Sequence, residues 1–289
     1  MSSPDLAPAW LDRSLFPFTS RALDVGGNTV HYIDEGQGPP LLLLHGNPTW
    51  SFLYRHLVRQ LAPHFRCVAL DYPGFGLSVA QPGYNFTPRE HSAVVEQLVD
   101  RLGLRDLTIM VQDWGGPIGL GLAGRRPELV RALVIGNTWA WPARQSRGLT
   151  LFSKLFGGRL ARFLIRRYNL LARWLIPAGT NRKLSPAELA AYFGPFPTPD
   201  SRLPTWVLPK EIVGSEAYLA EVETGLARLR DKPALIVWGE ADGAFRKPER
   251  ERLQTYFPHQ RQLLLPKAKH FIQENAPDEI SAAIREFLQ

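Results

Sequence analysis

The sequence predicts an α/β fold with a mostly parallel central sheet, helices on both faces and a helical insertion. Short apolar runs alternate with longer segments of helical periodicity, an order that favours parallel strands covered on both faces. The length of 289 residues suits one large domain of this kind with an added subdomain. Between residue 141 and about residue 230 the alternation breaks, which places the insertion there.

The N-terminal half contains three strand-like segments, at 28–36, 39–46 and 65–74, and the third ends in a Pro-Gly turn. Helical patterns follow the second and the third segment. A helix over 87–104 is indicated by Thr87 as the N-cap, Pro88 at the first helical position and Glu90, which together make a capping box.

The C-terminal half continues the alternation. Strands are predicted at 107–112, 131–137, 232–240 and 261–269, with a helix over 116–130 between the first two. Residues 1–141 and 231–289 are predicted to form the α/β core. Residues 142–230, rich in Arg, Phe, Trp and Pro, are predicted to form a helical cap inserted into that core.

Composition excludes several classes of protein. With 45% hydrophobic and 21% charged residues and no apolar run of roughly 20 residues, the chain reads as globular. The first residues do not resemble a signal peptide, so a cytoplasmic location is expected. The single Cys67 cannot form an internal disulfide. The net charge of +7 comes without a P-loop, zinc spacing or RNA-binding signature, so we expect no nucleic-acid partner, no metal and no cofactor.

Polar residues follow four of the predicted strands. Asn47, Asp113, Asp242 and His270 each come shortly after an apolar run. Ligands in open parallel sheets gather at the carboxyl ends of the strands, so these four residues are expected to meet at one edge.

Asp113 has the sequence context of a nucleophile elbow. In the G-x-S-x-G pattern it takes the serine position and Gly115 the trailing glycine, while Val111 replaces the leading glycine. An Asp after a strand is often only a helix N-cap. The chain order Asp113, Asp242, His270 is, however, the order nucleophile, acid, base of the α/β-hydrolase triad, and this joint pattern predicts that fold.

The chemistry follows from a carboxylate at that position. Asp113 is anionic near neutral pH and can attack an sp³ carbon to give an ester, which water activated by His270 then hydrolyses, with Asp242 orienting the imidazole. The backbone N–H groups of Asn47 and Trp114 would hold the oxyanion. The Trp114 indole and the Asn47 amide are neutral donors, which suit a departing halide, whereas an alkoxide would need an acid such as Tyr.

Several segments together resemble the haloalkane dehalogenases, among them HGNPTW, VQDWGGPIGL, VWGEADGAFR and AKHFIQENAPDEI. The resemblance implies that Asp113 is the nucleophile, His270 the base, and Asn47 with Trp114 the halide-binding pair. It also implies a haloalkane as the small-molecule substrate. The D-W-G-G piece is shared with epoxide hydrolases, whereas H-G-N-P-T-W is more specific.

The position of the catalytic acid indicates a subgroup. After the strand at 131–137 the chain has Asn137 and no carboxylate, while Asp242 follows a later strand. This combination resembles the third subgroup of the family, which also includes β-lactone decarboxylase-like proteins. The alternative function is therefore conversion of a β-lactone to a long-chain alkene and carbon dioxide, and the motifs do not separate the two.

Two further alternatives receive less support from the sequence. An epoxide hydrolase would need cap tyrosines over Asp113, for which Tyr168, Tyr192 and Tyr218 are available. A non-catalytic ligand binder of this fold typically lacks a catalytic residue, and this chain retains all of them.

The cap supplies two more expectations. Trp139 and Phe196 are predicted to line the substrate pocket, although cap aromatics usually form the cap's own core. Basic residues at spacings of three, four and seven are predicted to share one side of a helix; they are Arg159, Arg162, Arg166 and Arg173. A solvated face is the commoner explanation for such a pattern, and contact with an acidic partner or a membrane surface is the alternative.

Overall fold

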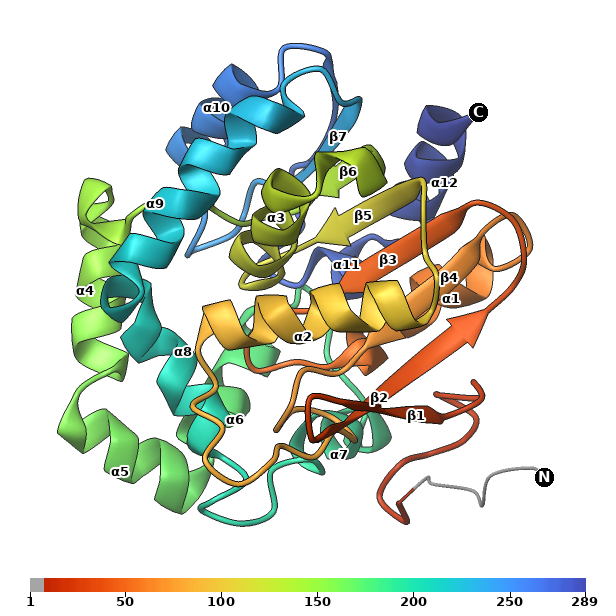
Figure 1. Cartoon of the computed structure of the whole chain (residues 1–289). Coiled ribbons are helices and arrows are strands. Elements are labelled where there is room, and N and C mark those ends of the chain that lie inside the picture. The colour runs from red at the N-terminus through yellow and green to blue at the C-terminus, as the bar shows by residue number, and fades with distance from the viewer. Residues whose placement is uncertain (1–7) are drawn as a thin grey trace.

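Eight strands form one sheet in the computed structural model, which describes residues 8–289 (Figure 1). Their order is β1-β2-β4-β3-β5-β6-β7-β8, with β1 and β2 antiparallel to their neighbours and all later pairs parallel. The predicted α/β fold with a mostly parallel sheet is confirmed. The strands are β1 (Arg21–Val25), β2 (Asn28–Glu35), β3 (Pro40–Leu44), β4 (Arg66–Leu70), β5 (Leu107–Val111), β6 (Val130–Ile135), β7 (Ala234–Gly239) and β8 (Gln260–Leu265).

The central strands are apolar on both faces because helices cover both. In β3, Leu42 and Leu44 pack into one hydrophobic cluster with α2 (Pro88–Arg101) and α3 (Gly115–Arg125). Leu41 and Leu43 point the other way, into a second cluster with α1 (Arg55–Leu61) and α12 (Pro277–Leu288). Successive side chains of β3 are thus buried on opposite faces of the sheet, which explains the continuous LLLL run.

The start of α2 has the predicted capping box. The Thr87 hydroxyl accepts a hydrogen bond from the Glu90 backbone N–H, and the Glu90 carboxylate accepts one from the Thr87 backbone N–H at 3.1 Å. Two N–H groups that the helix leaves unpaired at its start are thereby satisfied.

The chain between β6 and β7 is mainly helical, and α4, α5, α8 and α9 of this segment lie on the left side of Figure 1. None of the helices within residues 8–289 is long and apolar enough to cross a membrane. The boundaries of the predicted cap stay a prediction. The helices are α4 (Arg147–Phe156), α5 (Arg159–Tyr168), α6 (Leu170–Ala178), α7 (Pro186–Phe193), α8 (Leu203–Gly214) and α9 (Glu216–Gly225).

One expectation for this region is wrong. Arg159, Arg162 and Arg166 lie on α5, but Arg173 lies on α6, so the four do not share a helix. The break comes at Asn169, whose φ of +55° is left-handed. Asn tolerates that conformation better than most residues, and a left-handed residue ends an α-helix.

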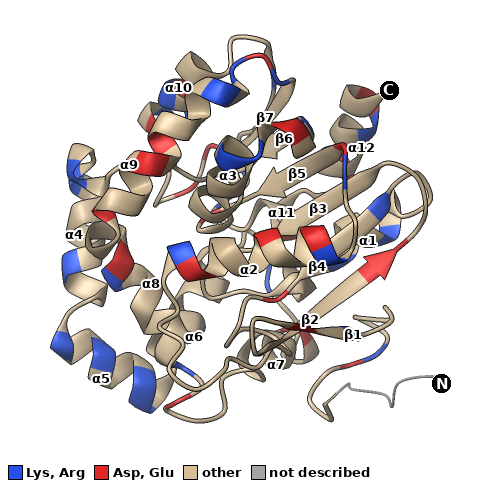
Figure 2. Cartoon of the chain, in the orientation of Figure 1, with Lys and Arg blue, Asp and Glu red and all other residues tan. Residues whose placement is uncertain are grey.

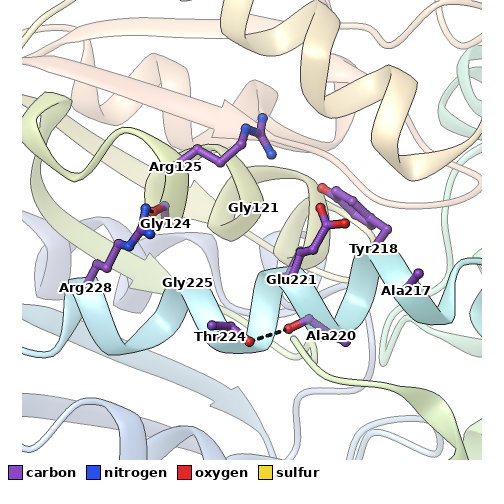
Figure 3. A pocket seen from close by; sticks show the side chains of 11 residues that line it. Gly121, Gly124, Arg125, Ala217, Tyr218, Ala220, Glu221, Thr224, Gly225 and Arg228 are labelled. Carbon is purple, nitrogen blue, oxygen red and sulfur yellow. Dashed lines mark hydrogen bonds between the residues drawn. The ribbon is translucent and has the colours of Figure 1, made fainter.

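Helix α9 lies within the predicted cap but packs against α3 of the core (Figure 3). A Cβ added at Gly124 would lie only 2.9 Å from the Gly225 Cα, so glycine at this crossing allows the two backbones to approach closely. Beside the crossing lies a surface hollow of about 450 Å³, bordered by Arg125, Glu221 and Arg228. Three glycines and two alanines are among the residues that line it.

The capping box provides a test of this fold. Thr87→Ala should lower the free energy of unfolding by about 1 kcal/mol, because the Glu90 N–H at the start of α2 loses its acceptor, the Thr87 hydroxyl. The measurement is urea denaturation followed by circular dichroism. Thr224→Ala is the matched control: Thr224 is exposed within α9 and bonds only to the Ala220 carbonyl of its own helix. Equal losses in both variants would contradict the assigned role of Thr87.

Candidate active site

Asp113 occupies a sharp turn between β5 and α3. Its φ of +51° is left-handed, a conformation that costs a non-glycine residue about 1–3 kcal/mol. The turn is fixed by two bonds: the Asp113 N–H donates to the Asn137 carbonyl at 2.8 Å, and the Thr138 hydroxyl donates to the Asp113 carbonyl at 2.5 Å. This backbone conformation directs the Asp113 side chain away from β5 and toward the segment that follows β3.

Two glycines make room for this turn. A Cβ at Gly115 would lie 2.1 Å from the Leu44 carbonyl oxygen, and one at Gly46 would lie 2.4 Å from the Asp113 Cβ. Both distances are far below van der Waals contact. The glycine after the predicted nucleophile and the glycine of the H-G-N segment therefore serve the same purpose, to bring β3 and the elbow together.

The two oxygens of the Asp113 carboxylate have different surroundings. The Asn47 backbone N–H donates to Oδ1 at 2.7 Å, and the Trp114 backbone N–H also bonds to this carboxylate. Oδ2 lies 3.6 Å from the His270 Nε2. Oδ1 is thus held by a backbone donor, while Oδ2 faces the imidazole.

His270 lies between Asp113 and Asp242. Its Nδ1 is 3.0 Å from the Asp242 Oδ2, and the other carboxylate oxygen of Asp242 accepts the Ala244 N–H at 2.7 Å. Asp242 follows β7, and His270 lies in the turn between β8 and α11 (Ile272–Asn275). The structure therefore brings together three predicted residues that are far apart in the sequence, with a carboxylate on each side of the ring.

Burial and charge act in opposite directions on these groups. Burial raises the pKa of Asp113 above its ordinary value, although the His270 charge and the two backbone N–H groups act to lower it. Burial alone would lower the pKa of His270, but the charges of Asp242 and Asp113 outweigh it, and the pKa of His270 lies above its usual value. In this way Asp242 favours the protonated imidazole.

A mostly apolar cavity of about 420 Å³ lies over these residues. Asn47, Asp113, Trp114, Asp242 and His270 all line it, together with side chains of α4, α6 and α8. The five residues predicted from the sequence therefore meet at one cavity at the carboxyl ends of the strands.

Two neutral N–H donors border the cavity beside Asp113. Within residues 8–289, the Trp114 indole has no hydrogen-bond acceptor. The Asn47 amide donates one N–H to the Thr205 carbonyl at 3.1 Å, which leaves its second N–H for a ligand. No Lys or Arg is among the residues that line the cavity.

Of the two aromatic residues predicted to line the pocket, only one does so. Trp139 lines the cavity and packs edge-to-face on Trp114, with ring centroids 4.7 Å apart. Phe196 does not line it. It is 1% exposed and packs against Phe75 at 6.1 Å, so it belongs to the core between the cap and the sheet.

The cap tyrosines are also placed away from the cavity. Tyr192 donates to Glu274, and Tyr218 donates to the Pro117 carbonyl at 2.8 Å. Tyr168 is 53% exposed. None of the three lines the cavity, so none is in place to donate a proton to a leaving alkoxide.

Sequence reasoning missed Gln112, which precedes Asp113. Its amide Nε2 lies 3.2 Å from the His270 Nε2 and donates to the His270 carbonyl at 3.1 Å. The Gln112 side chain therefore contacts both the backbone and the ring of His270 and helps to hold them in place. A polar residue at the end of an otherwise apolar strand was the available signal.

One cluster of potential metal ligands lies elsewhere, at His56, Glu188 and Glu274. Both carboxylates are already paired with the guanidinium groups of Arg55 and Arg182. Two cations thus occupy the positions around these carboxylates, and the donor set does not suit a metal ion.

Comparisons with known proteins agree with this geometry. Residues 39–277 match the family described as alpha/beta hydrolase fold. Haloalkane dehalogenase 2 of Mycobacterium tuberculosis is 45% identical over 95% of this chain and 96% of its own length. A cis-3-alkyl-4-alkyloxetan-2-one decarboxylase of Shewanella oneidensis is 33% identical over 95% and 90%. A solved haloalkane dehalogenase from Bradyrhizobium elkani superposes with a TM-score of 0.86 at 27% identity, covering 94% and 97%.

The electrostatics of His270 can be measured directly. In Asp242→Asn the largest cause that raises the pKa of His270 is removed, so burial dominates and the imidazole should titrate below its ordinary value. The pKa is read from an NMR titration of the ring. Glu240→Gln, an exposed charge at the end of the same strand, should leave the midpoint unchanged. An unshifted midpoint in Asp242→Asn would refute the assigned coupling.

Proposed function

Because this chain belongs to the α/β-hydrolase fold family and, within it, to the haloalkane dehalogenases, we propose that it hydrolyses carbon–halogen bonds through an ester of Asp113. The observation that carries the proposal is the arrangement at the cavity floor. A carboxylate with one free oxygen faces an apolar space next to two neutral N–H donors. That set can stabilise a departing halide ion without protonating it.

In the first step, Oδ2 of Asp113 attacks the carbon that bears the halogen. A carbon–oxygen bond forms, the carbon–halogen pair of electrons leaves with the halide, and Oδ1 becomes the carbonyl oxygen of the ester. The Trp114 indole N–H and the free N–H of Asn47 stabilise the charge on the halide. The apolar lining excludes water, which strengthens both interactions.

In the second step, His270 removes a proton from water, and the resulting hydroxide attacks the Cγ of Asp113. Negative charge collects on Oδ1, which the Asn47 backbone N–H already contacts, and the Trp114 backbone N–H bonds to the same carboxyl group. The ester bond then breaks, and the alcohol leaves with the proton from His270. The carboxylic acid formed at Asp113 loses its proton to solvent, which restores the carboxylate; this proton and the halide ion are the two remaining products.

The two steps also alternate the basicity of His270. Esterification removes the charge of Asp113, which is one of the causes that raise the pKa of His270. The pKa of the imidazole therefore falls when the ester is present, which favours the neutral ring at the step that requires a base. Asp242 remains to stabilise the imidazolium that forms during hydrolysis.

A second candidate is the decarboxylation of a β-lactone. It is favoured by the two relatives named cis-3-alkyl-4-alkyloxetan-2-one decarboxylase, at 33% and 32% identity. In this reaction the same oxygen of Asp113 would attack the lactone ring, with loss of carbon dioxide and formation of an alkene. The 45% relatives favour dehalogenation over this alternative.

One incubation series separates these functions. The protein is supplied with 1-bromobutane or 1,2-dibromoethane and scored for bromide, and in parallel with a long-chain β-lactone and scored for alkene. We expect bromide release that Asp113→Asn lowers by about 10⁴-fold or more, and no loss with the exposed Asp278→Asn. Alkene without bromide would establish the second candidate. If a folded protein releases no bromide and forms no alkene, the result would indicate a ligand binder.

The covalent intermediate gives an independent check. His270→Ala should release one bromide per protein from 1-bromobutane and then stop, because no base activates the water. Mass spectrometry should find one butyl group added to the peptide that contains Asp113. His259→Ala, a histidine outside the cavity, is the control and should turn over with no lasting adduct. Full turnover in His270→Ala would exclude it as the base.

A further inference from the structure

Charge is distributed very unevenly along this chain. Between Glu128 and Glu188 there are 11 Lys and Arg residues and no Asp or Glu. In the rest of the chain 23 Lys and Arg are outnumbered by 27 Asp and Glu, so the net charge of +7 arises entirely from this segment. Figure 2 shows the consequence: α4 and α5 carry Lys and Arg and no acidic residue.

Most of these cations lack an acidic partner. Arg144, Arg166 and Arg182 form ion pairs with carboxylates. Six others on α4, α5 and α6 are exposed, and no carboxylate within residues 8–289 lies within ion-pair distance of them; they are Arg147, Lys154, Arg159, Arg162, Arg167 and Arg173. The positive charge of the three helices is therefore available to a partner.

The same three helices expose large apolar side chains. Seven of the ten large hydrophobic residues that are exposed within residues 8–289 belong to positions 151–174. On α5, Leu160 is 72% exposed and Phe163 58%, between Arg159 and Arg167. We call the exposed cations and apolar residues of α4, α5 and α6 the α4–α6 face.

The mouth of the cavity opens on this face. Gly148 of α4 and Trp174 and Ala178 of α6 line the cavity and are exposed, so they form part of its rim. Trp174 is 48% exposed and stacks on Phe156 of α4, with ring centroids 5.3 Å apart. An apolar path thus connects the surface helices with the cavity above Asp113.

We propose that the α4–α6 face docks on an anionic lipid surface, and that the cavity takes an apolar substrate directly from that bilayer. Helices that combine Lys and Arg with exposed Leu, Phe and Trp bind at the boundary of lipid headgroups and acyl chains. The unpaired cations match the negative charge of such a surface. Docking would turn the cavity mouth toward the hydrocarbon, where long-chain substrates are concentrated. The uptake step rests on the proposed function, whereas docking does not.

Two other occupants fit the observations less well. A second copy of this chain placed face to face would bring identical unpaired cations together, which disfavours a symmetric dimer through this surface. An acidic protein would satisfy the cations. It would leave unexplained why apolar side chains surround the mouth of an apolar cavity.

The direct test is co-sedimentation with lipid vesicles. The protein should bind vesicles that contain phosphatidylserine, bind pure phosphatidylcholine far more weakly, and lose binding as salt is raised. A triple variant, Lys154→Gln, Arg159→Gln and Arg167→Gln, should weaken binding by about a hundredfold, since each cation contributes roughly a factor of five. The triple control Arg101→Gln, Arg261→Gln and Arg285→Gln removes the same charge outside this face and should bind nearly as the parent protein does.

The apolar side chains are tested separately. Leu160→Ser with Phe163→Ser should also weaken vesicle binding, while Val79→Ser with Leu264→Ser, which are 63% and 39% exposed outside this face, should not. Thermal melting confirms that each variant is folded. Binding to polyglutamate that matches binding to vesicles and ignores Leu160 and Phe163 would overturn the proposal in favour of an acidic protein. Oligomers that depend on Leu160 and Phe163 would overturn it in favour of a second copy.

Uptake has its own readout. The triple cation variant should hydrolyse a long-chain bromoalkane embedded in vesicles more slowly than the parent protein does, and 1,2-dibromoethane in buffer equally fast. If the variant and the parent protein hydrolyse the embedded bromoalkane at equal rates, delivery from the bilayer would be refuted. Absence of any turnover would contradict the proposed function and, with it, the uptake step, while vesicle binding would still decide the docking step.

Discussion

The left-handed backbone of Asp113 is the constraint on which the rest of the site depends. Glycines at positions 46 and 115 leave the space that this turn needs, because any side chain there would collide with Asp113 or with β3. The turn places one carboxylate oxygen on the Asn47 backbone N–H and leaves the other toward His270. A relaxed residue at this position would point its side chain elsewhere, and neither oxygen would reach its partner.

This asymmetry of the carboxylate organises the proposed chemistry. Neutral donors lie on one side of Asp113, and a histidine supported by a second carboxylate lies on the other. The first set suits a departing anion, and the second suits the activation of water. Because the charge of Asp113 helps to set the pKa of His270, the formation of an ester is coupled to the basicity of the group that hydrolyses it.

The helices above the sheet have two different roles. Their inner residues close the cavity, as Leu149 and Ile212 do, and Phe196 fills the core below. Their outer residues carry the excess positive charge of the molecule and much of its exposed apolar surface. Since the cavity rim belongs to the same helices, recognition of a surface and access to the site are joined in one structural unit.

The sequence by itself determined the α/β order, the capping box at Thr87 and the set of Asp113, Asp242, His270, Asn47 and Trp114, because strand ends and turn residues carry local signals. It did not determine that Gln112 contacts His270, that Phe196 lies outside the cavity, or that Asn169 divides the basic segment into two helices. Those features depend on side-chain packing between distant segments and on one backbone dihedral, and neither leaves a periodic pattern in the chain. Only the tertiary structure decided them.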